Sequence, residues 1–209
     1  MNALIIVDIQ NDFLPGGALA VNKGDEIISI VNKLQKSGYF DLIIATQDWH
    51  PRDHSSFASN HPGKKPFEKI LLSELEQILW PDHCVQGTDG ADFPKSLDIN
   101  NIETIFRKGM DKDIDSYSGF FDNGKQKDTG LAAYLKGRNI GEVFITGLAG
   151  DFCVFYTALD AIESGFKTIL IEDATRSINN NNFLNSVKML REKNALIIKS
   201  DPILRGLNI

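Results

Sequence analysis

The sequence predicts an α/β protein in which a mostly parallel sheet of roughly six strands lies between two helix layers, a three-layer α/β/α, Rossmann-like arrangement. Three observations support this fold class. Short apolar runs suited to buried parallel strands recur along the 209 residues. Helical patterns lie between most of these runs. No repeat, low-complexity tract or linker divides the chain, so we expect a single domain over residues 1–209.

The first elements are a strand, a helix and a second strand. Residues 3–7 (ALIIV) form an uninterrupted apolar run, as expected for a strand covered on both faces. Residues 24–37 repeat Ile, Val and Leu at helical spacing and predict a helix. Residues 42–46 (LIIAT) predict the next strand.

Residues 49–101 interrupt this alternation. They hold all four histidines, both tryptophans and five of the seven prolines. Within them only residues 71–79 show a helical pattern. So long an irregular segment is usually functional or disordered, and its aromatic content disfavours disorder. We therefore expect an ordered insertion at about residues 49–101 that binds a metal and the substrate.

The second half returns to alternating strands and helices. Apolar runs predict strands, and helical stripes predict helices, the first of which begins with the capping candidate Asp128. Because strand and helix alternate, right-handed crossovers should place helices on both faces of the sheet. The expected strands are residues 104–106, 143–146, 168–171 and 195–198, and the expected helices are residues 128–136, 152–164 and 182–193.

Composition narrows the class of protein. The net charge of −6 without a basic block argues against nucleic acid as a partner. No apolar run approaches the roughly 20 residues that span a bilayer, and the N-terminus has the character of a strand rather than a signal peptide. The two cysteines lie far apart in sequence and require no disulfide. We therefore expect a cytoplasmic, reduced protein without a membrane partner, and a homo-oligomer stays open.

Cys153 has the most informative position in the chain. It follows the apolar run 143–146 and stands where a helical pattern begins. Backbone N–H groups and the helix dipole at such a position favour a thiolate, the nucleophilic form. The alternative is a small buried hydrophobic residue, the commoner role of a lone cysteine.

Other reactive groups also follow the expected strands. Asp8 ends the first strand, Asp48 and His50 follow the second, and Lys108 follows a later one. In open α/β sheets the reacting groups gather at the carboxyl ends of the strands. Asp8 could be a turn residue or a general base for the thiol of Cys153. Lys108 could be a surface lysine or the cation that stabilises a thiolate.

A carboxylate and several imidazoles suit a metal site. Asp48 and His50 lie two residues apart in an extended segment, so both side chains can point to one side. His83 in the insertion would add a third ligand, and this mixture suits Zn²⁺, Fe²⁺ or Mn²⁺. The alternative is a hydrogen-bonded cluster without metal. His54 could cap, hydrogen-bond or act as a fourth ligand, and we expect His61 on the surface.

Three aromatic residues, Phe13, Trp80 and Tyr117, are candidates for the wall of a binding pocket. A flat aromatic substrate would stack between such rings. Each of the three could equally belong to the core.

Six segments together carry a family resemblance. They are VDIQNDF (7–13), TQDWHP (46–51), WPDHCVQG (80–87), FRKG (106–109), DSYSGF (115–120) and TGLAGDFCV (146–154). They stand in family order and span nearly the whole chain. The chain thereby resembles the nicotinamidases (pyrazinamidases), in the cysteine-hydrolase branch of the isochorismatase-like superfamily.

The resemblance implies an activity and roles for particular residues. It implies hydrolysis of nicotinamide to nicotinate and ammonia through a cysteine thioester, as in NAD salvage, and deamidation of pyrazinamide. One divalent metal ion, Zn²⁺ before Fe²⁺ or Mn²⁺, would position the pyridine ring. The matching positions are Asp8, Lys108 and Cys153 for the catalytic triad, Asp48, His50 and His83 for the metal ligands, and His54 for a ligand found in some members only.

The resemblance also bears on the segment before Cys153. Two backbone N–H groups, of Ala149 and Cys153, match the oxyanion hole of the family, and the Leu148–Ala149 peptide bond is expected to be cis. Gly150 departs from the family, which commonly has Thr there. We expect this change to alter the rate or the local rigidity and not the reaction. Isochorismatases proper lack the nucleophilic cysteine, so Cys153 speaks against that branch.

Three other functions fit the sequence less well. An amidase for N-carbamoyl or ureido compounds would not need the set Asp48, His50 and His83. A non-catalytic α/β binding protein would not need an intact triad. A redox thiol protein is disfavoured because there is no Cys-x-x-Cys and Cys84, which we expect to be a packing residue, has no predicted place beside Cys153.

Overall fold

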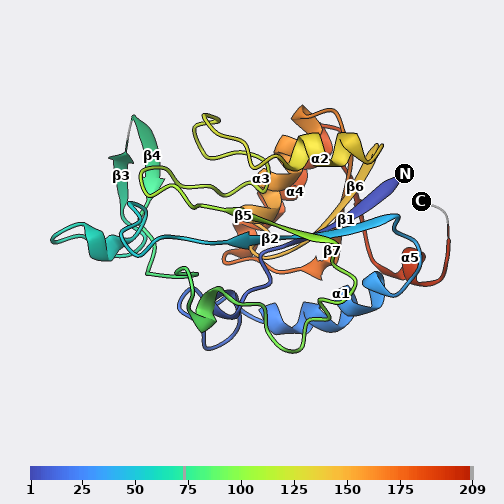
Figure 1. The fold of residues 1–209 in the computed structure, drawn as a ribbon, viewed down its shortest axis with the longest axis horizontal. Helices are drawn as coiled ribbons and strands as arrows, with labels where there is room; N and C mark the ends of the chain where they lie inside the picture. The colour runs from blue at the N-terminus through green and yellow to red at the C-terminus, as the bar shows by residue number, and fades with distance from the viewer. Residues whose placement is uncertain (73, 208–209) are drawn as a thin grey trace.

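The computed structural model describes residues 1–72 and 74–207. Its centre is a sheet of six strands in the order β5-β2-β1-β6-β7-β8, and every neighbouring pair is parallel (Figure 1). The predicted fold class and all six predicted strands are confirmed. The strands are β1 (Asn2–Val7), β2 (Leu42–Asp48), β5 (Thr104–Lys108), β6 (Glu142–Gly147), β7 (Lys167–Thr175) and β8 (Leu196–Ile198).

Helices cover both faces of this sheet, as predicted (Figure 1). Two separate apolar cores assign them to their faces. One core packs the first and last helices against the sheet, and the other packs the three helices between them. The first face has α1 (Ile28–Gln35) and α5 (Asp201–Leu204), and the second has α2 (Leu131–Gly137), α3 (Cys153–Glu163) and α4 (Asn180–Glu192).

Asp128 does not cap α2. The N-cap residue is Gly130, and it provides no side-chain hydrogen bond. The carboxylate of Asp128 instead accepts a hydrogen bond from the Gly130 N–H at 2.8 Å, in the turn before the helix. An aspartate that bonds two residues ahead makes a turn and delays the helix, so α2 begins later than the sequence pattern indicated.

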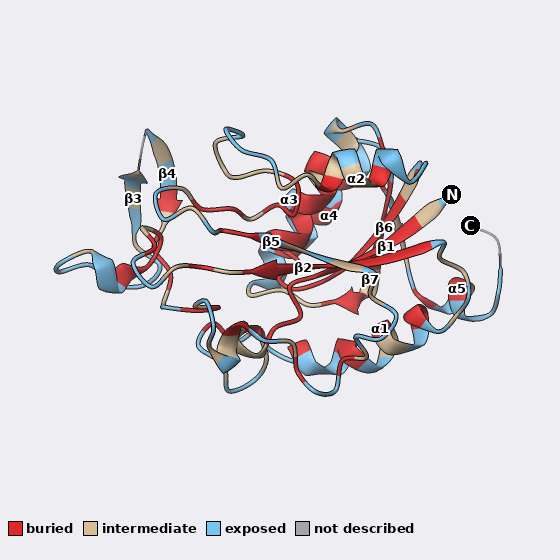
Figure 2. Cartoon of the chain, viewed as in Figure 1, coloured by how far each residue is buried: buried red, intermediate tan, exposed pale blue. Residues whose placement is uncertain are grey.

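Strand β1 shows why an uninterrupted apolar run forms the centre of the sheet. Leu4 and Ile6 belong to the core on the α1 side, while Ala3, Ile5 and Val7 belong to the core on the α3 side. All five are fully buried, as the colouring of β1 in Figure 2 shows. A strand with helices on both faces needs apolar residues at every position. This requirement explains why residues 3–7 form the central strand β1.

The strand order places the site. Strands β2 and β5 lie on one side of β1, and β6, β7 and β8 lie on the other. The carboxyl ends of parallel strands meet at one edge of the sheet, and a change of direction in strand order opens a crevice there. The groups that follow β1, β2, β5 and β6 are therefore brought to one place.

The helix predicted at residues 71–79 is wrong for the described part of that range; position 73 lies outside the described residues. The structure has an antiparallel hairpin, β3 (Lys69–Leu72) and β4 (Leu75–Ile78), set apart from the main sheet (Figure 1). A helix there would present its apolar stripe to solvent, because Leu71 remains 78% exposed and has no core surface to pack on. The strand instead turns Gln77 inward, where its Nε2 donates to the Asp115 carboxylate at 2.9 Å.

None of the helices in the described part of the chain is long and apolar enough to cross a membrane.

Candidate active site and metal centre

Cys153 is the first residue of α3 and is 5% exposed. Its Sγ lies 3.5 Å from the Nζ of Lys108. The thiol and one carboxylate oxygen each from Asp8 and Asp48 lie within 4.8 Å of one another. The structure therefore brings together the thiol, the lysine and the aspartates that the sequence singled out.

The protonation state of Cys153 differs from the sequence-based expectation of a stabilised thiolate. Burial raises the pKa of the thiol well above its usual value. The charge of Lys108 lowers this pKa. The carboxylates of Asp8 and Asp48 raise it, as burial does, and these effects together outweigh that of Lys108. Desolvation beside two carboxylates opposes the effect that the N-terminus of α3 has on the thiol. The resting group is a thiol that needs a base.

Lys108 is the centre of the buried charge cluster. Its Nζ lies 2.9 Å from Oδ2 of Asp8 and 2.6 Å from Oδ1 of Asp48. It also donates to the Ser116 carbonyl at 2.9 Å. Burial alone would lower the pKa of this lysine, but Asp48 and Asp8 outweigh burial and raise it well above its usual value. Lys108 therefore stays charged and ties the thiol to both aspartates.

Asp8 is suited to take the thiol proton. It has a left-handed backbone (φ 46°) directly after β1, and its Oδ1 accepts a hydrogen bond from the Thr46 hydroxyl at 2.6 Å. Burial raises its pKa, an effect that the charge of Lys108 only partly offsets. Its Oδ2 accepts no well-directed hydrogen bond from any described residue. That oxygen is thus open to a proton.

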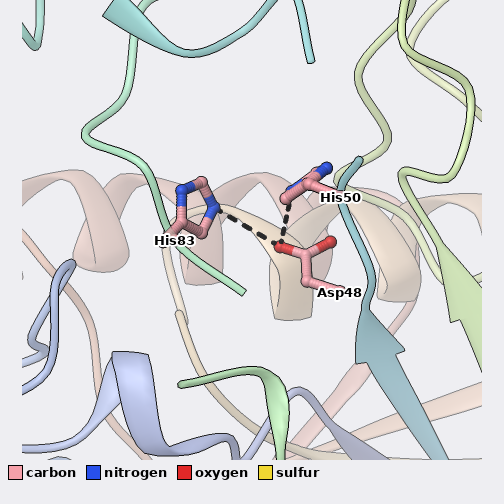
Figure 3. A group of neighbouring side chains, drawn as sticks. All are labelled: Asp48, His50 and His83. Carbon is pink, nitrogen blue, oxygen red and sulfur yellow. Dashed lines mark ion pairs between the residues drawn. The ribbon is translucent and has the colours of Figure 1, made fainter. Parts of the chain in front are cut away.

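Asp48, His50 and His83 face one another (Figure 3). Oδ2 of Asp48 lies 3.4 Å from Nε2 of His50 and 3.7 Å from Nε2 of His83. All three residues are at least 95% buried. Burial alone would raise the pKa of Asp48, but Lys108 and His50 hold it well below its usual value. The carboxylate therefore stays ionised, as a metal ligand must be.

The remaining ring nitrogens show that this donor set fits a metal ion. Nδ1 of His50 lies 2.9 Å from the Gly109 carbonyl, and Nδ1 of His83 lies 2.8 Å from the Pro81 carbonyl. Such contacts fix the tautomer that carries a proton on Nδ1 and leaves Nε2 as the donor to the metal. Both free Nε2 atoms point toward the Asp48 carboxylate, which is the arrangement of a three-ligand metal centre with open positions.

His54 lies beside this cluster and His61 does not. The Nδ1 of His54 is 2.7 Å from the Ser56 hydroxyl, and its Nε2 is buried without a hydrogen-bond partner among the described residues. Donor atoms of His50, His54 and Asp115 lie within 4.8 Å of one another. Burial lowers the pKa of His54 to about 4, so this imidazole is neutral at pH 7. His61 is half-buried and bonds the Ser55 carbonyl instead.

A narrow pocket opens onto Cys153. Phe13, Trp80 and Tyr117 line it, together with Asp48 and His83 from the metal cluster. The indole N–H of Trp80 donates to the Tyr117 hydroxyl at 3.3 Å and holds the two rings edge to face. A wider surface cleft runs from Pro51 to Thr129 but contains neither Cys153 nor these aromatic residues. The narrow pocket is therefore the candidate site.

Two backbone N–H groups point to an oxyanion site. Neither Ala149 nor Cys153 donates its N–H to any acceptor among the described residues. Unpaired N–H groups are expected at the start of a helix, here α3. The peptide bond between Leu148 and Ala149 is cis, as the resemblance implied.

The chain is similar to known proteins over most of its length. The model of the isochorismatase domain matches residues 2–202. The chain belongs to the isochorismatase family. A nicotinamidase from Acinetobacter baylyi is 50% identical over 182 residues, which cover 87% of this chain and 84% of that protein.

The fold of this isochorismatase-family chain is similar to those of solved structures. A nicotinamidase/pyrazinamidase from Acinetobacter baumanii superposes with a TM-score of 0.92 at 47% identity, covering 97% of each chain. A pyrazinamidase from Pyrococcus horikoshii, solved in complex with zinc, gives a TM-score of 0.77 at 37% identity, covering 95% of this chain and 98% of that one.

Sequence reasoning missed several residues of this isochorismatase-family site. Asp115 lines the pocket and stood inside a quoted motif, so an acidic residue followed by Ser116 and Tyr117 was the available signal. Gln10 was also inside a quoted motif. Phe152 was likewise inside a quoted motif, whereas the remaining wall residues Leu19 and Ile178 come from loops and show no periodic pattern that could have marked them.

Proposed function

We propose that this protein is a nicotinamidase that hydrolyses nicotinamide to nicotinate and ammonia, and that it also deamidates pyrazinamide. The observation that carries the proposal is the buried set of Asp8, Lys108 and Cys153 next to Asp48 and the histidine cluster, with Cys153, Asp48 and His83 lining one aromatic-walled pocket. A nucleophile with a base behind it opens onto a ring-binding pocket, as hydrolysis of an aromatic carboxamide requires.

The first half of the reaction forms a thioester. Asp8 takes the proton of the Cys153 thiol, and the sulfur attacks the amide carbon. Lys108 offsets the negative charge that remains on the sulfur during this transfer. The pKa of both Asp8 and Cys153 is raised by burial, so the proton moves between two groups that are both ready to hold it.

The tetrahedral intermediate then collapses. The N–H groups of Ala149 and Cys153 bind its oxyanion, and losing one such donor typically costs about 10²–10³ in rate. The carbon–nitrogen bond breaks, and ammonia leaves with the proton from Asp8. A water molecule next gives a proton to Asp8 and attacks the thioester. The carbon–sulfur bond breaks, nicotinate forms, and the proton returns to Cys153.

Asp48, His50 and His83 would hold one divalent cation, with His54 as a candidate fourth ligand. When bound there, the cation would supply a Lewis acid for the lone pair of the pyridine nitrogen and so help to orient the ring. Zn²⁺ fits this donor set, and the zinc complex of the related pyrazinamidase supports that choice. Fe²⁺ or Mn²⁺ would suit the same ligands, and elemental analysis of protein purified without added metal distinguishes the three.

The insertion at about residues 49–101 would be the metal- and substrate-binding part of a single domain, because it carries His50, His83 and Trp80. Both cysteines are free, which suits a reducing compartment such as the cytoplasm.

The deciding experiment measures ammonia release from nicotinamide by the purified protein, before and after removal of metal with a chelator. We expect release that is lost on chelation and restored by Zn²⁺, Fe²⁺ or Mn²⁺. The Cys153→Ala variant should show no turnover and a normal fold by circular dichroism. Ammonia release by that variant would overturn the thioester route. Absence of release from the wild-type protein with every metal would overturn the proposed substrate.

A further inference from the structure

The loop that carries the proposed oxyanion site, residues 148–152, is held by the segment that leads into α4. The Gly150 N–H donates to the Arg176 carbonyl at 2.7 Å. The carboxylate of Asp151 accepts the N–H groups of Ile178 at 3.0 Å and Asn179 at 2.9 Å. The loop therefore takes its position from residues 176–179 as well as from α3.

A side chain of α4 fills the space beside Gly150 in this loop. A Cβ added at Gly150 would lie 2.7 Å and 2.8 Å from two ring carbons of Phe183, and 3.0 Å from the Thr175 methyl group. Real Cβ atoms do not approach other atoms so closely. Gly150 has no left-handed φ that would require glycine. Glycine is thus needed here for space, and the space is filled by the ring of Phe183.

Phe183 is itself firmly placed. It is 7% exposed and belongs to the core between the sheet and α4. The side chain of Asn179 caps α4 by accepting the Asn182 N–H at 3.1 Å, which fixes the first turn of the helix. A flat ring on a capped helix is a rigid support for the backbone that it touches.

We infer that Phe183 is a positioning residue for amide hydrolysis: its ring, seated against Gly150, sets the position of the Ala149 N–H relative to Cys153. This inference rests on the proposed function, since the loop has an oxyanion to bind only if the protein is an amidase. Phe183 does not line the substrate pocket, whereas Ala149, which precedes Gly150 in the loop, does. The ring therefore acts through the backbone and not on the substrate.

The expected effect is on the rate and not on substrate binding. Loss of the ring contact lets the Ala149 N–H move, and misplacement of an oxyanion donor reduces stabilisation of the transition state. The nicotinamide ring would still be held by Phe13, Trp80 and Tyr117. We therefore expect Phe183→Leu to lower kcat by about 10-fold, less than the 10²–10³ of a lost donor, with KM changed less than about 3-fold.

Phe166→Leu is the matched control. Phe166 is 6% exposed and packs in the same core, but it precedes β7, at the opposite end of that strand from the site. The same atoms are removed from the same core in both variants. Both should lose melting temperature to a similar extent, and only Phe183→Leu should lose kcat. Equal kcat in the two variants would overturn the inference.

A size exchange between the two positions gives a second test. Gly150→Thr alone should lower kcat, because the new side chain meets the ring of Phe183. Gly150→Thr combined with Phe183→Ala removes that collision and should be more active than either single variant. A double variant that loses the product of the two single losses would contradict a shared packing role. Both tests compare variants with an active wild-type protein, so failure of the proposed function would be recognised first, as missing wild-type turnover.

Discussion

At the scale of single residues, Lys108 links the two halves of the site. One buried ammonium group contacts Asp8, the proposed base, and Asp48, a proposed metal ligand. Without that charge the two carboxylates would face each other across a desolvated space, where like charges repel strongly. The lysine therefore allows the proposed base and the proposed metal ligand to remain close together.

Substitution of Lys108 tests this role. Lys108→Met keeps the length of the side chain and removes its charge. We expect kcat to fall by at least about 10²-fold. Because a buried ion pair is broken, the free energy of unfolding should fall by about 3–5 kcal/mol. Lys36→Met is the control, since Lys36 is paired with Asp98 at 2.9 Å but is itself 64% exposed. Its effect should be below about 1 kcal/mol. Urea unfolding and steady-state kinetics measure both, and similar stability losses in the two variants would be incompatible with a buried charge centre.

The raised pKa of Asp8 makes a prediction about pH. Only the ionised carboxylate can take the thiol proton, and burial raises its pKa above the ordinary value of 3.8. At any given pH a larger fraction of Asp8 is therefore protonated than in an exposed aspartate. As the pH is lowered, kcat/KM should begin to fall above pH 3.8. The profile is measured with saturating metal, so that the histidine ligands stay unprotonated, and with circular dichroism to confirm folding. An acid limb at or below 3.8 would exclude a desolvated Asp8 as the base.

At the scale of elements, Gln10 joins the loop after β1 to the end of β2. Its Nε2 donates to the carbonyls of Asp48 and Ala91, each at 2.8 Å, and its Oε1 accepts the Asp48 N–H at 2.8 Å. The side-chain amide thus pairs with both backbone groups of Asp48, as a neighbouring strand would. This pairing fixes the backbone of the ligand whose carboxylate faces His50 and His83.

Removal of this amide should weaken both the fold and the metal centre. Gln10→Leu removes the side-chain partner of the Asp48 N–H and of its carbonyl, and a buried backbone group left unpaired costs about 1–3 kcal/mol. The Ala91 carbonyl keeps a second donor, Nε2 of Gln47 at 2.8 Å. We also expect the dissociation constant for Zn²⁺ to rise by about 10–100-fold, as for other residues that orient metal ligands. Gln86→Leu is the control, because Gln86 is exposed and bonds a single carbonyl, that of Trp49. Metal titration measures the dissociation constant for Zn²⁺, and urea unfolding measures the stability of both variants. An unchanged metal affinity in Gln10→Leu would refute the positioning role.

The elements that could be predicted from the sequence are those whose pattern is fixed by the core. Strand β1 sends apolar side chains into the cores on both faces of the sheet, and helix α3 packs a mostly apolar stripe against the sheet, so both were found. The hairpin of β3 and β4 was missed because its apolar residues are partly buried or exposed and Leu71 is 78% exposed, while the one buried position of the two strands is polar, Gln77 in contact with Asp115. A contact between residues 38 positions apart leaves no periodic trace in either segment.

At the scale of the whole molecule, the strand order explains why dispersed residues form one site. Asp8, Asp48, Lys108 and Cys153 lie at or just after the carboxyl ends of four adjacent strands, β1, β2, β5 and β6. Each could therefore be proposed from its place behind an apolar run. Their protonation states could not, because the raised pKa of Cys153 depends on burial and on two carboxylates that only the folded chain brings near.

The metal cluster should also stabilise the entire fold. Its ligands come from the end of β2, from the residues directly after it and from the insertion, so a bound cation connects segments that unfolding would separate. A ligand that binds only the folded state adds about 2.7 kcal/mol at 100 times its dissociation constant. For a chain of this size that amounts to a rise of roughly 5–10 °C in melting temperature. We expect Zn²⁺ to produce this rise in the wild-type protein and a chelator to reverse it.

Two histidine variants show whether that rise belongs to the proposed centre. His83→Ala removes a ligand whose Nε2 faces Asp48, and the rise should disappear. His61→Ala removes an imidazole that bonds the Ser55 carbonyl outside the cluster, and the rise should remain. Thermal unfolding with and without Zn²⁺ measures the rise in melting temperature of each variant, and this measurement does not require an active enzyme. A rise that persists in His83→Ala would place the stabilising cation elsewhere. A rise lost in both variants would mean that the insertion as a whole, and not this ligand set, governs metal binding.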